Sequence, residues 1–142
     1  MELWELEARE QVRHTISAYT FGGDRGRLDE LAAAFAEDGV LQIEQDDVST
    51  GRDAIIERLS KVVTMDRHPA HMHHHISGTH FRSVTPAEID VSSYFLVITD
   101  TGPDHWGRYR DRFVPVDDRW LIAHRQVTTD GYVEGSTFRG LT

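Results

Sequence analysis

The chain has 142 residues, no cysteine and a formal charge of −9. This length predicts a single domain over residues 1–142. Without cysteine, the sequence excludes disulfides, thiolate metal sites and a thiol nucleophile. The acidic charge argues against a protein that follows a nucleic-acid backbone, because such binding needs clustered Lys and Arg.

No apolar run approaches the length of a membrane span, and the first residues lack the basic start and apolar core of a signal peptide. We therefore expect a soluble, cytoplasmic protein. Its expected partner is a small molecule, with no nucleic acid and no membrane.

Three helices are predicted in the first half of the chain. Residues 2–21 carry apolar side chains at three- and four-residue spacing, namely Ala8, Val12, Ile16 and Tyr19. The same spacing predicts a shorter helix over 28–35, which Asp38-Gly39 closes as a C-cap. A third helix is expected to start near Arg52 and to end before His68-Pro69.

The remaining segments are predicted strands. Residues 40–45 alternate apolar and polar side chains, and a turn and short return follow. Four long strands are expected over 71–84, 88–99, 106–116 and 120–128, with the TGPDH segment at 101–105 as a loop. Four strands in succession predict an antiparallel meander, and hence an α+β fold whose helices cover a concave sheet face around a cavity. The tail over 130–142 is predicted to be irregular and could cover a pocket mouth or a neighbouring subunit.

Six of the nine histidines lie between His68 and His80. Alternation along a strand places His73 and His75 on one face and His74 on the other. Three interpretations compete: a metal site, a set of surface or interface residues, or one inward histidine that acts as a general base. No Cys ligand and no HExxH spacing is available, so we expect no native metal site and assign five of the six histidines to the surface.

The strand at 106–116 divides its side chains by charge. Alternation predicts that Tyr109, Asp111 and Phe113 face inward while the arginines face outward. Asp111 could have a catalytic or substrate-binding role, or it could form a buried ion pair with an arginine such as Arg125, and both alternatives stay open. The arginine face predicts solvent or a subunit interface. We expect a homo-oligomer, a dimer first and a trimer second.

Several motifs resemble those of SnoaL-like (NTF2-like) domains. They are Tyr19 followed by Asp24-x-x-x-x-Asp29-x-Leu31, Phe35 followed by Asp38-Gly39, and the segments HHHISG, GRYRDRF and RWLIAHR. The resemblance covers most of residues 1–130. It implies an NTF2-like cone, in which three N-terminal helices pack on a strongly curved antiparallel sheet with an internal pocket.

Within this superfamily the pattern is similar to the scytalone dehydratase-like lyases, which need no cofactor and use an Asp–His pair. The resemblance assigns the catalytic pair to Asp24 and His74. Without it, Asp24 would be interpreted as a turn residue or a helix N-cap. Scytalone dehydratase has a second pocket histidine on the next strand, and the matching stretch here, near Thr99, has none.

The predicted substrate contacts are Tyr19, Tyr109, Asp111 and Phe113, although both tyrosines could instead pack in the core. The expected substrate is a small hydrophobic or polyketide-like molecule, with no cofactor and no metal. The outcome could be elimination by a dehydratase, isomerisation, or cyclisation of the polyketide-cyclase type. The alternative is a non-catalytic module that binds a small ligand or a partner protein.

Overall fold

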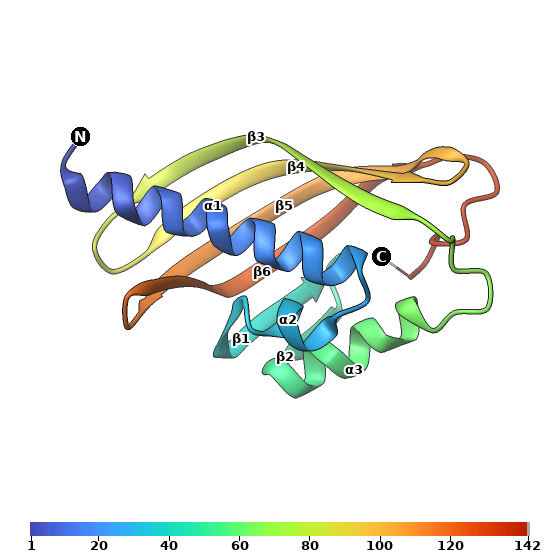
Figure 1. The fold of residues 1–142 in the computed structure, drawn as a ribbon, viewed down its shortest axis with the longest axis horizontal. Helices are drawn as coiled ribbons and strands as arrows, with labels where there is room; N and C mark the ends of the chain where they lie inside the picture. Colours follow the sequence, from blue (N-terminus) through green and yellow to red (C-terminus); the bar gives the residue numbers. More distant parts are fainter. Residues whose placement is uncertain (142) are drawn as a thin grey trace.

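The computed structural model describes residues 1–141. The helices are α1 (Leu3–Asp24), α2 (Leu28–Ala32) and α3 (Arg52–Val63), and the strands are β1 (Phe35–Ile43), β2 (Asp47–Thr50), β3 (Met72–Val84), β4 (Ile89–Thr99), β5 (Gly102–Val116) and β6 (Arg119–Tyr132). One six-stranded sheet has the order β2-β1-β6-β5-β4-β3. Helix α1 runs across the concave face of the long strands, and α2 and α3 lie at the β1 and β2 end (Figure 1). The predicted α+β cone is confirmed.

The four long strands form the predicted antiparallel meander, since β3, β4, β5 and β6 pair in succession. The sheet is nevertheless mixed, because β1 joins the edge of β6 in parallel. Parallel strands need a long crossover between them, and the chain from α3 to β5 supplies it. The periodicity of a single strand carries no information about this pairing.

Helix α1 buries the four apolar side chains that the spacing predicted, Ala8, Val12, Ile16 and Tyr19. It continues three residues beyond the predicted end at Phe21, through two glycines to Asp24. A glycine is needed at position 22, because the Cβ of any other residue would lie only 2.8 Å from the Leu31 backbone nitrogen of α2. The two helices therefore pack closely, and Asp24 lies at the very end of α1.

The predicted second helix is too long. Helix α2 ends at Ala32, and Phe35 already pairs with Ile122 of β6. The Ile122 N–H donates to the Ala34 carbonyl at 2.9 Å, which starts the ladder at the residue before β1. Long-range pairing and full burial of Phe35 outweigh the local helical spacing. Asp38-Gly39 therefore lies within a strand and is not a helix C-cap.

Two further segments differ from the prediction. The expected loop at 101–105 belongs mostly to β5, whose Gly102 pairs with Thr99 of β4. Strand β6 continues to Tyr132, so the irregular tail begins three residues later than expected. The tail returns to the body of the protein, where Phe138 is almost completely buried.

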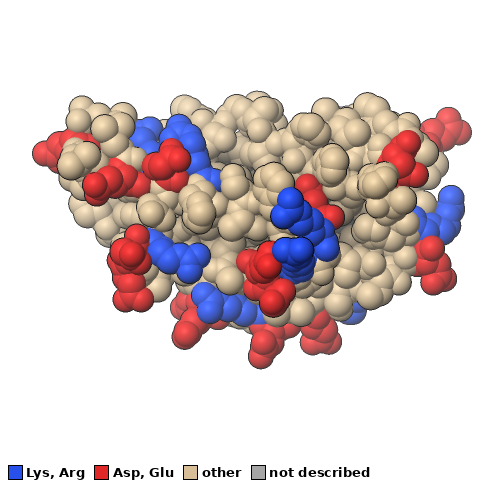
Figure 2. All heavy atoms as spheres, in the orientation of Figure 1, with Lys and Arg blue, Asp and Glu red and all other residues tan. Residues whose placement is uncertain are grey.

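The side chains at the centre of the core come from every layer, with Phe35, Ile55, Ile89, Phe113 and Ile122 fully buried. Among residues 1–141, no helix combines the length and the apolar character that crossing a membrane requires. On the face that Figure 2 shows, the basic side chains of the described residues lie among acidic ones and form no broad patch of one sign.

Candidate active site

Asp24 and His74 are brought together from the end of α1 and the start of β3. Oδ1 of Asp24 lies 2.6 Å from Nδ1 of His74, and Oδ2 accepts the His74 backbone N–H at 2.9 Å. Both side chains are largely shielded from solvent, with exposed fractions of 11% for Asp24 and 20% for His74. The carboxylate thus holds both the backbone and the ring of one residue.

This contact determines which nitrogen of His74 is free. An ionised carboxylate can only accept hydrogen bonds, so Nδ1 of the neutral imidazole carries the hydrogen. The other nitrogen, Nε2, is left with its lone pair. Asp24 does not act as the N-cap of α2: within the described chain that position is Arg27, and no side chain caps the helix.

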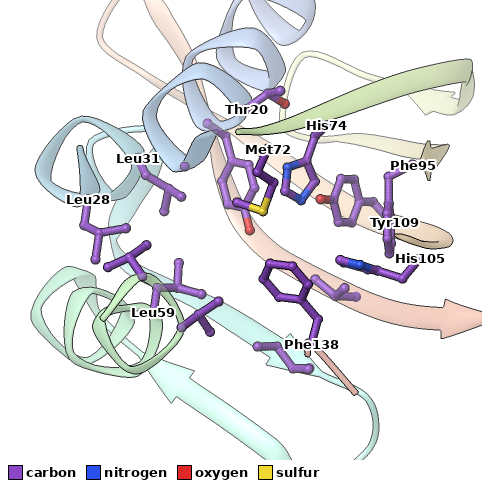
Figure 3. A pocket seen from close by; sticks show the side chains of 16 residues that line it. Thr20, Leu28, Leu31, Leu59, Met72, His74, Phe95, His105, Tyr109 and Phe138 are labelled. Atoms are coloured by element: carbon purple, nitrogen blue, oxygen red, sulfur yellow. The ribbon is translucent and has the colours of Figure 1, made fainter. Parts of the chain in front are cut away.

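His74 points into a cavity between the sheet and the helices (Figure 3). The cavity volume is about 80 Å³. A single water needs roughly 10–15 Å³ of such space, so a compact, ring-sized ligand is the appropriate scale. Most of the lining is apolar, and it consists of Tyr19, Thr20, Gly23, Leu28, Leu31, Ile43, Leu59, Val62, Val63, Met72, His74, Phe95, His105, Tyr109, Val127 and Phe138.

Tyr19 and Tyr109 lie where the prediction placed them, on the cavity wall. Burial raises the pKa of Tyr19, and it raises the pKa of Tyr109 well above its ordinary value. Both phenols therefore keep their hydrogen at neutral pH and can donate it to an oxygen of a ligand. The Tyr109 ring also stacks on Phe95 with centroids 4.8 Å apart, which fixes its orientation.

Asp111 and Phe113 face inward as predicted, but the structure places both outside the set of described residues that line the cavity. Asp111 instead accepts two hydrogen bonds from Arg125, each of 2.8 Å, and both side chains are fully buried. Burial alone would lower the pKa of Arg125, but the Asp111 carboxylate raises it overall, so the guanidinium stays charged. Of the two alternatives for Asp111, the structure has the buried ion pair with Arg125, and Asp111 does not reach the cavity.

This ion pair supports the wall from behind. The Arg125 Cζ lies 4.2 Å from the Tyr19 ring centroid and 3.9 Å from that of Tyr109. A guanidinium that lies over two aromatic rings gains cation–π attraction from each of them. The pair therefore holds two lining residues in place without reaching the cavity itself.

His105 is a cavity residue that the sequence analysis missed. Its Nδ1 lies 2.7 Å from Oδ2 of Asp104, and its side chain is only 2% exposed. The available signal was the Asp-His dipeptide at 104–105, but the segment was interpreted as a loop. A register shift after Val97 makes Asp104 an extra residue in β5, so two consecutive side chains are buried, contrary to strand alternation.

The other histidines of the 68–80 cluster lie away from the cavity. His71, His73, His75 and His80 are exposed, as predicted. His68 is half-buried, and its ring meets Phe138 edge to face at 6.0 Å. Over residues 1–141, no three His, Asp or Glu side chains converge in a way that could hold a metal ion.

Comparisons with known proteins identify the family of the chain. A family model described as a SnoaL-like domain matches residues 4–126. Among curated proteins, none matches the chain. A candidate scytalone dehydratase from Novosphingobium aromaticivorans DSM 12444 has a similar crystal structure, with 27% identity and a TM-score of 0.75 over 87% of this chain and 84% of that one.

Two more distant structures share the fold. LinA has 14% identity and a TM-score of 0.79 over 92% of each chain. ActVI-ORFA from Streptomyces coelicolor has 21% identity and a TM-score of 0.73 over 86% of this chain and 96% of that one. With the family model covering most of its length, the chain belongs to the SnoaL-like domain family and has the NTF2-like fold of that family.

Proposed function

We propose that the chain is a small-molecule enzyme that removes a proton from carbon by acid–base catalysis with the Asp24–His74 pair, without a cofactor. The observation that supports this is the single arrangement in which Asp24 fixes Nδ1 of His74 while the ring faces an apolar cavity. A neutral imidazole with a free Nε2 is a suitable base at physiological pH.

In the proposed step, the proton of a C–H bond next to an electron-withdrawing group moves to Nε2 of His74. The ionised Asp24 stabilises the imidazolium that forms. The hydroxyl of Tyr109 or Tyr19 can donate a hydrogen bond to the oxygen that gains negative charge. The apolar wall excludes water, which strengthens these interactions.

The fate of the carbanion defines the reaction class. Loss of a β-hydroxyl as water, with its proton supplied by the His74 imidazolium, would make the chain a dehydratase. Return of the proton elsewhere would make it an isomerase, and attack of the carbanion on an internal carbonyl a cyclase. We place dehydration first, because the candidate scytalone dehydratase is 27% identical over most of both chains. The apolar lining supports a small hydrophobic or polyketide-like substrate.

The test is turnover of a panel of ring-sized β-hydroxy ketones and activated ketones by the wild type, Asp24→Asn and His74→Ala. We expect both variants to lose most of the activity. His75→Ala is the matched control, since His75 is the next residue and is exposed. Equal rates for the wild type and His74→Ala would contradict the proposal.

The alternative from the sequence, a non-catalytic ligand-binding module, shares the cavity but gives the Asp24–His74 pair no role. It predicts that ring-sized ligands bind and leave unchanged. The same panel therefore separates the two functions, provided that binding is measured alongside product formation.

We also propose that the outer face of the sheet joins copies of the chain into a homo-oligomer, a dimer first and a trimer second. Strands β4 and β5 present Tyr94, Leu96 and Trp106 outward, and Tyr94 is 61% exposed. Leu96 and Trp106 pair across the two strands, so the apolar surface is continuous. Sedimentation that finds only monomer at micromolar concentration would contradict this proposal.

A further inference from the structure

A second imidazole faces the cavity beside His74. Val97 of β4 pairs with His74 on one side and with His105 on the other, so the three residues form one row across the sheet. Directly paired residues point to the same face of a sheet. The two ring centroids are 6.5 Å apart and both rings are directed into the cavity (Figure 3), so one ring-sized molecule can reach both.

His105 is oriented by a carboxylate of its own. Oδ2 of Asp104 lies 2.7 Å from its Nδ1 and also accepts the Ser136 hydroxyl at 2.7 Å. The backbone carbonyl of Asp104 accepts the Val133 N–H at 2.8 Å. The tail thus fixes Asp104, and Asp104 fixes the imidazole.

Three aromatic rings enclose the His105 ring and restrict its rotation. Tyr132 stacks on it with centroids 5.6 Å apart, and Phe138 and Phe95 lie at 5.0 and 6.0 Å. Burial is the largest effect and lowers the pKa of His105, the hydrogen bond to Asp104 raises it, and a charge on the neighbouring His74 lowers it. The pKa lies below its ordinary value overall, so the ring is neutral at neutral pH.

The hydrogen of this neutral ring is on Nδ1, because the Asp104 carboxylate can only accept. Nε2 is consequently a hydrogen-bond acceptor. Among the described residues, Asp104 binds the side chain of this ring at Nδ1, so a ligand that brings a hydroxyl can pair with Nε2 and a ligand without one cannot.

We propose that His105 is a specificity-determining residue: its Nε2 accepts a hydrogen bond from a hydroxyl of the substrate that lies against His74. The substrate class is then a ring-sized, mostly apolar molecule with a phenol, enol or alcohol hydroxyl close to the carbon that loses its proton. Asp104 and Ser136 are positioning residues that hold the acceptor. The position of the reacting carbon rests on the proposed function, whereas the hydroxyl preference does not.

The test compares binding of 4-methylphenol with that of its methyl ether, 4-methylanisole, by NMR titration. We expect the wild type to prefer the phenol by about fivefold, as one net hydrogen bond predicts. His105→Asn keeps a donor for Asp104 but has no atom at the Nε2 position, so the preference should disappear. His75→Asn, at an exposed histidine, should keep it. An unchanged preference in His105→Asn would overturn the proposal.

A second measurement uses only the wild type, so it does not depend on whether a variant folds. In the ¹⁵N-labelled wild type, the Nε2 resonance of His105 should move on addition of 4-methylphenol and stay in place with 4-methylanisole. Equal responses to both ligands, or none to either, would overturn the proposal. These readouts do not depend on turnover, so loss of the hydroxyl preference and loss of the proposed activity are separate outcomes.

Discussion

Two aspartates that the sequence analysis considered for the site, Asp24 and Asp111, differ in what they hold. Asp24 binds a histidine, a side chain that can both take up and release a proton, on a wall that remains partly open. Asp111 binds an arginine, whose charge is permanent, in a place with no exposure at all. The partner and the depth of each carboxylate, more than its inward direction, therefore distinguish the aspartate that we propose to be catalytic from the structural one.

The largest effect, on the free energy of unfolding, is expected from breaking the buried Asp111–Arg125 ion pair. Asp111→Ala leaves the Arg125 guanidinium buried and unpaired, which should lower the free energy of unfolding by about 3–5 kcal/mol. Asp130→Ala is the control, because its partner Arg108 is half-exposed and surface pairs contribute at most about 1 kcal/mol. Urea denaturation measures both. Similar losses for the two variants would show that Asp111 does not support the wall.

Asp24→Asn should show the opposite pattern, with a loss of about 10²-fold in turnover and little change in stability. The His74 backbone N–H can only donate, so the new amide must turn its oxygen there and its NH₂ toward Nδ1. This forces the hydrogen onto Nε2 and removes the base. The measurement is the initial rate with the best substrate of the panel, with Asp29→Asn, an exposed neighbour, as control. Normal turnover by Asp24→Asn would remove the contrast between the two aspartates.

A smaller effect is expected from the pH dependence of stability. The pKa of His105 is lowered by burial from its ordinary value of 6.5, so below pH 6.5 the unfolded chain takes up a proton that the folded chain does not. Stability should therefore fall as the pH drops through this range, and the fall should be shallower in His105→Asn. Denaturation midpoints between pH 7.5 and 5.5 test this. Parallel curves for the two proteins would exclude the contribution of His105.

The sequence was sufficient to predict the α+β architecture and one of the two carboxylate–histidine pairs that the described residues form at the cavity, Asp24 with His74, but not Asp104 with His105. Apolar spacing located α1, and strand alternation separated His74 from His73 and His75. These patterns are local, and burial on one face imposes them directly. The pairing of Asp24 with His74 was implied by family motifs, since no local pattern relates residues 50 positions apart.

Other features depend on long-range structure. The extra residue in β5 interrupts the alternation of buried and exposed side chains, so the pattern did not predict that Asp104 and His105 are both buried. The parallel pairing of β1 with β6 cannot be predicted from the sequence of either strand alone. Phe138 lies in a glycine-containing tail that has no periodicity, yet it lines the cavity. Such placements follow from the assembled sheet and helices, so they could not be read from residue spacing.

The most direct test of the central claim, that Nε2 of His74 takes a proton from carbon, is deuterium exchange of ring-sized ketones in D₂O followed by proton NMR. We expect the wild type and the exposed control His75→Ala to exchange the α-hydrogens well above the background rate. His74→Ala should exchange them at least about 10²-fold more slowly than the wild type. Exchange at the same rate with and without His74 would contradict the account.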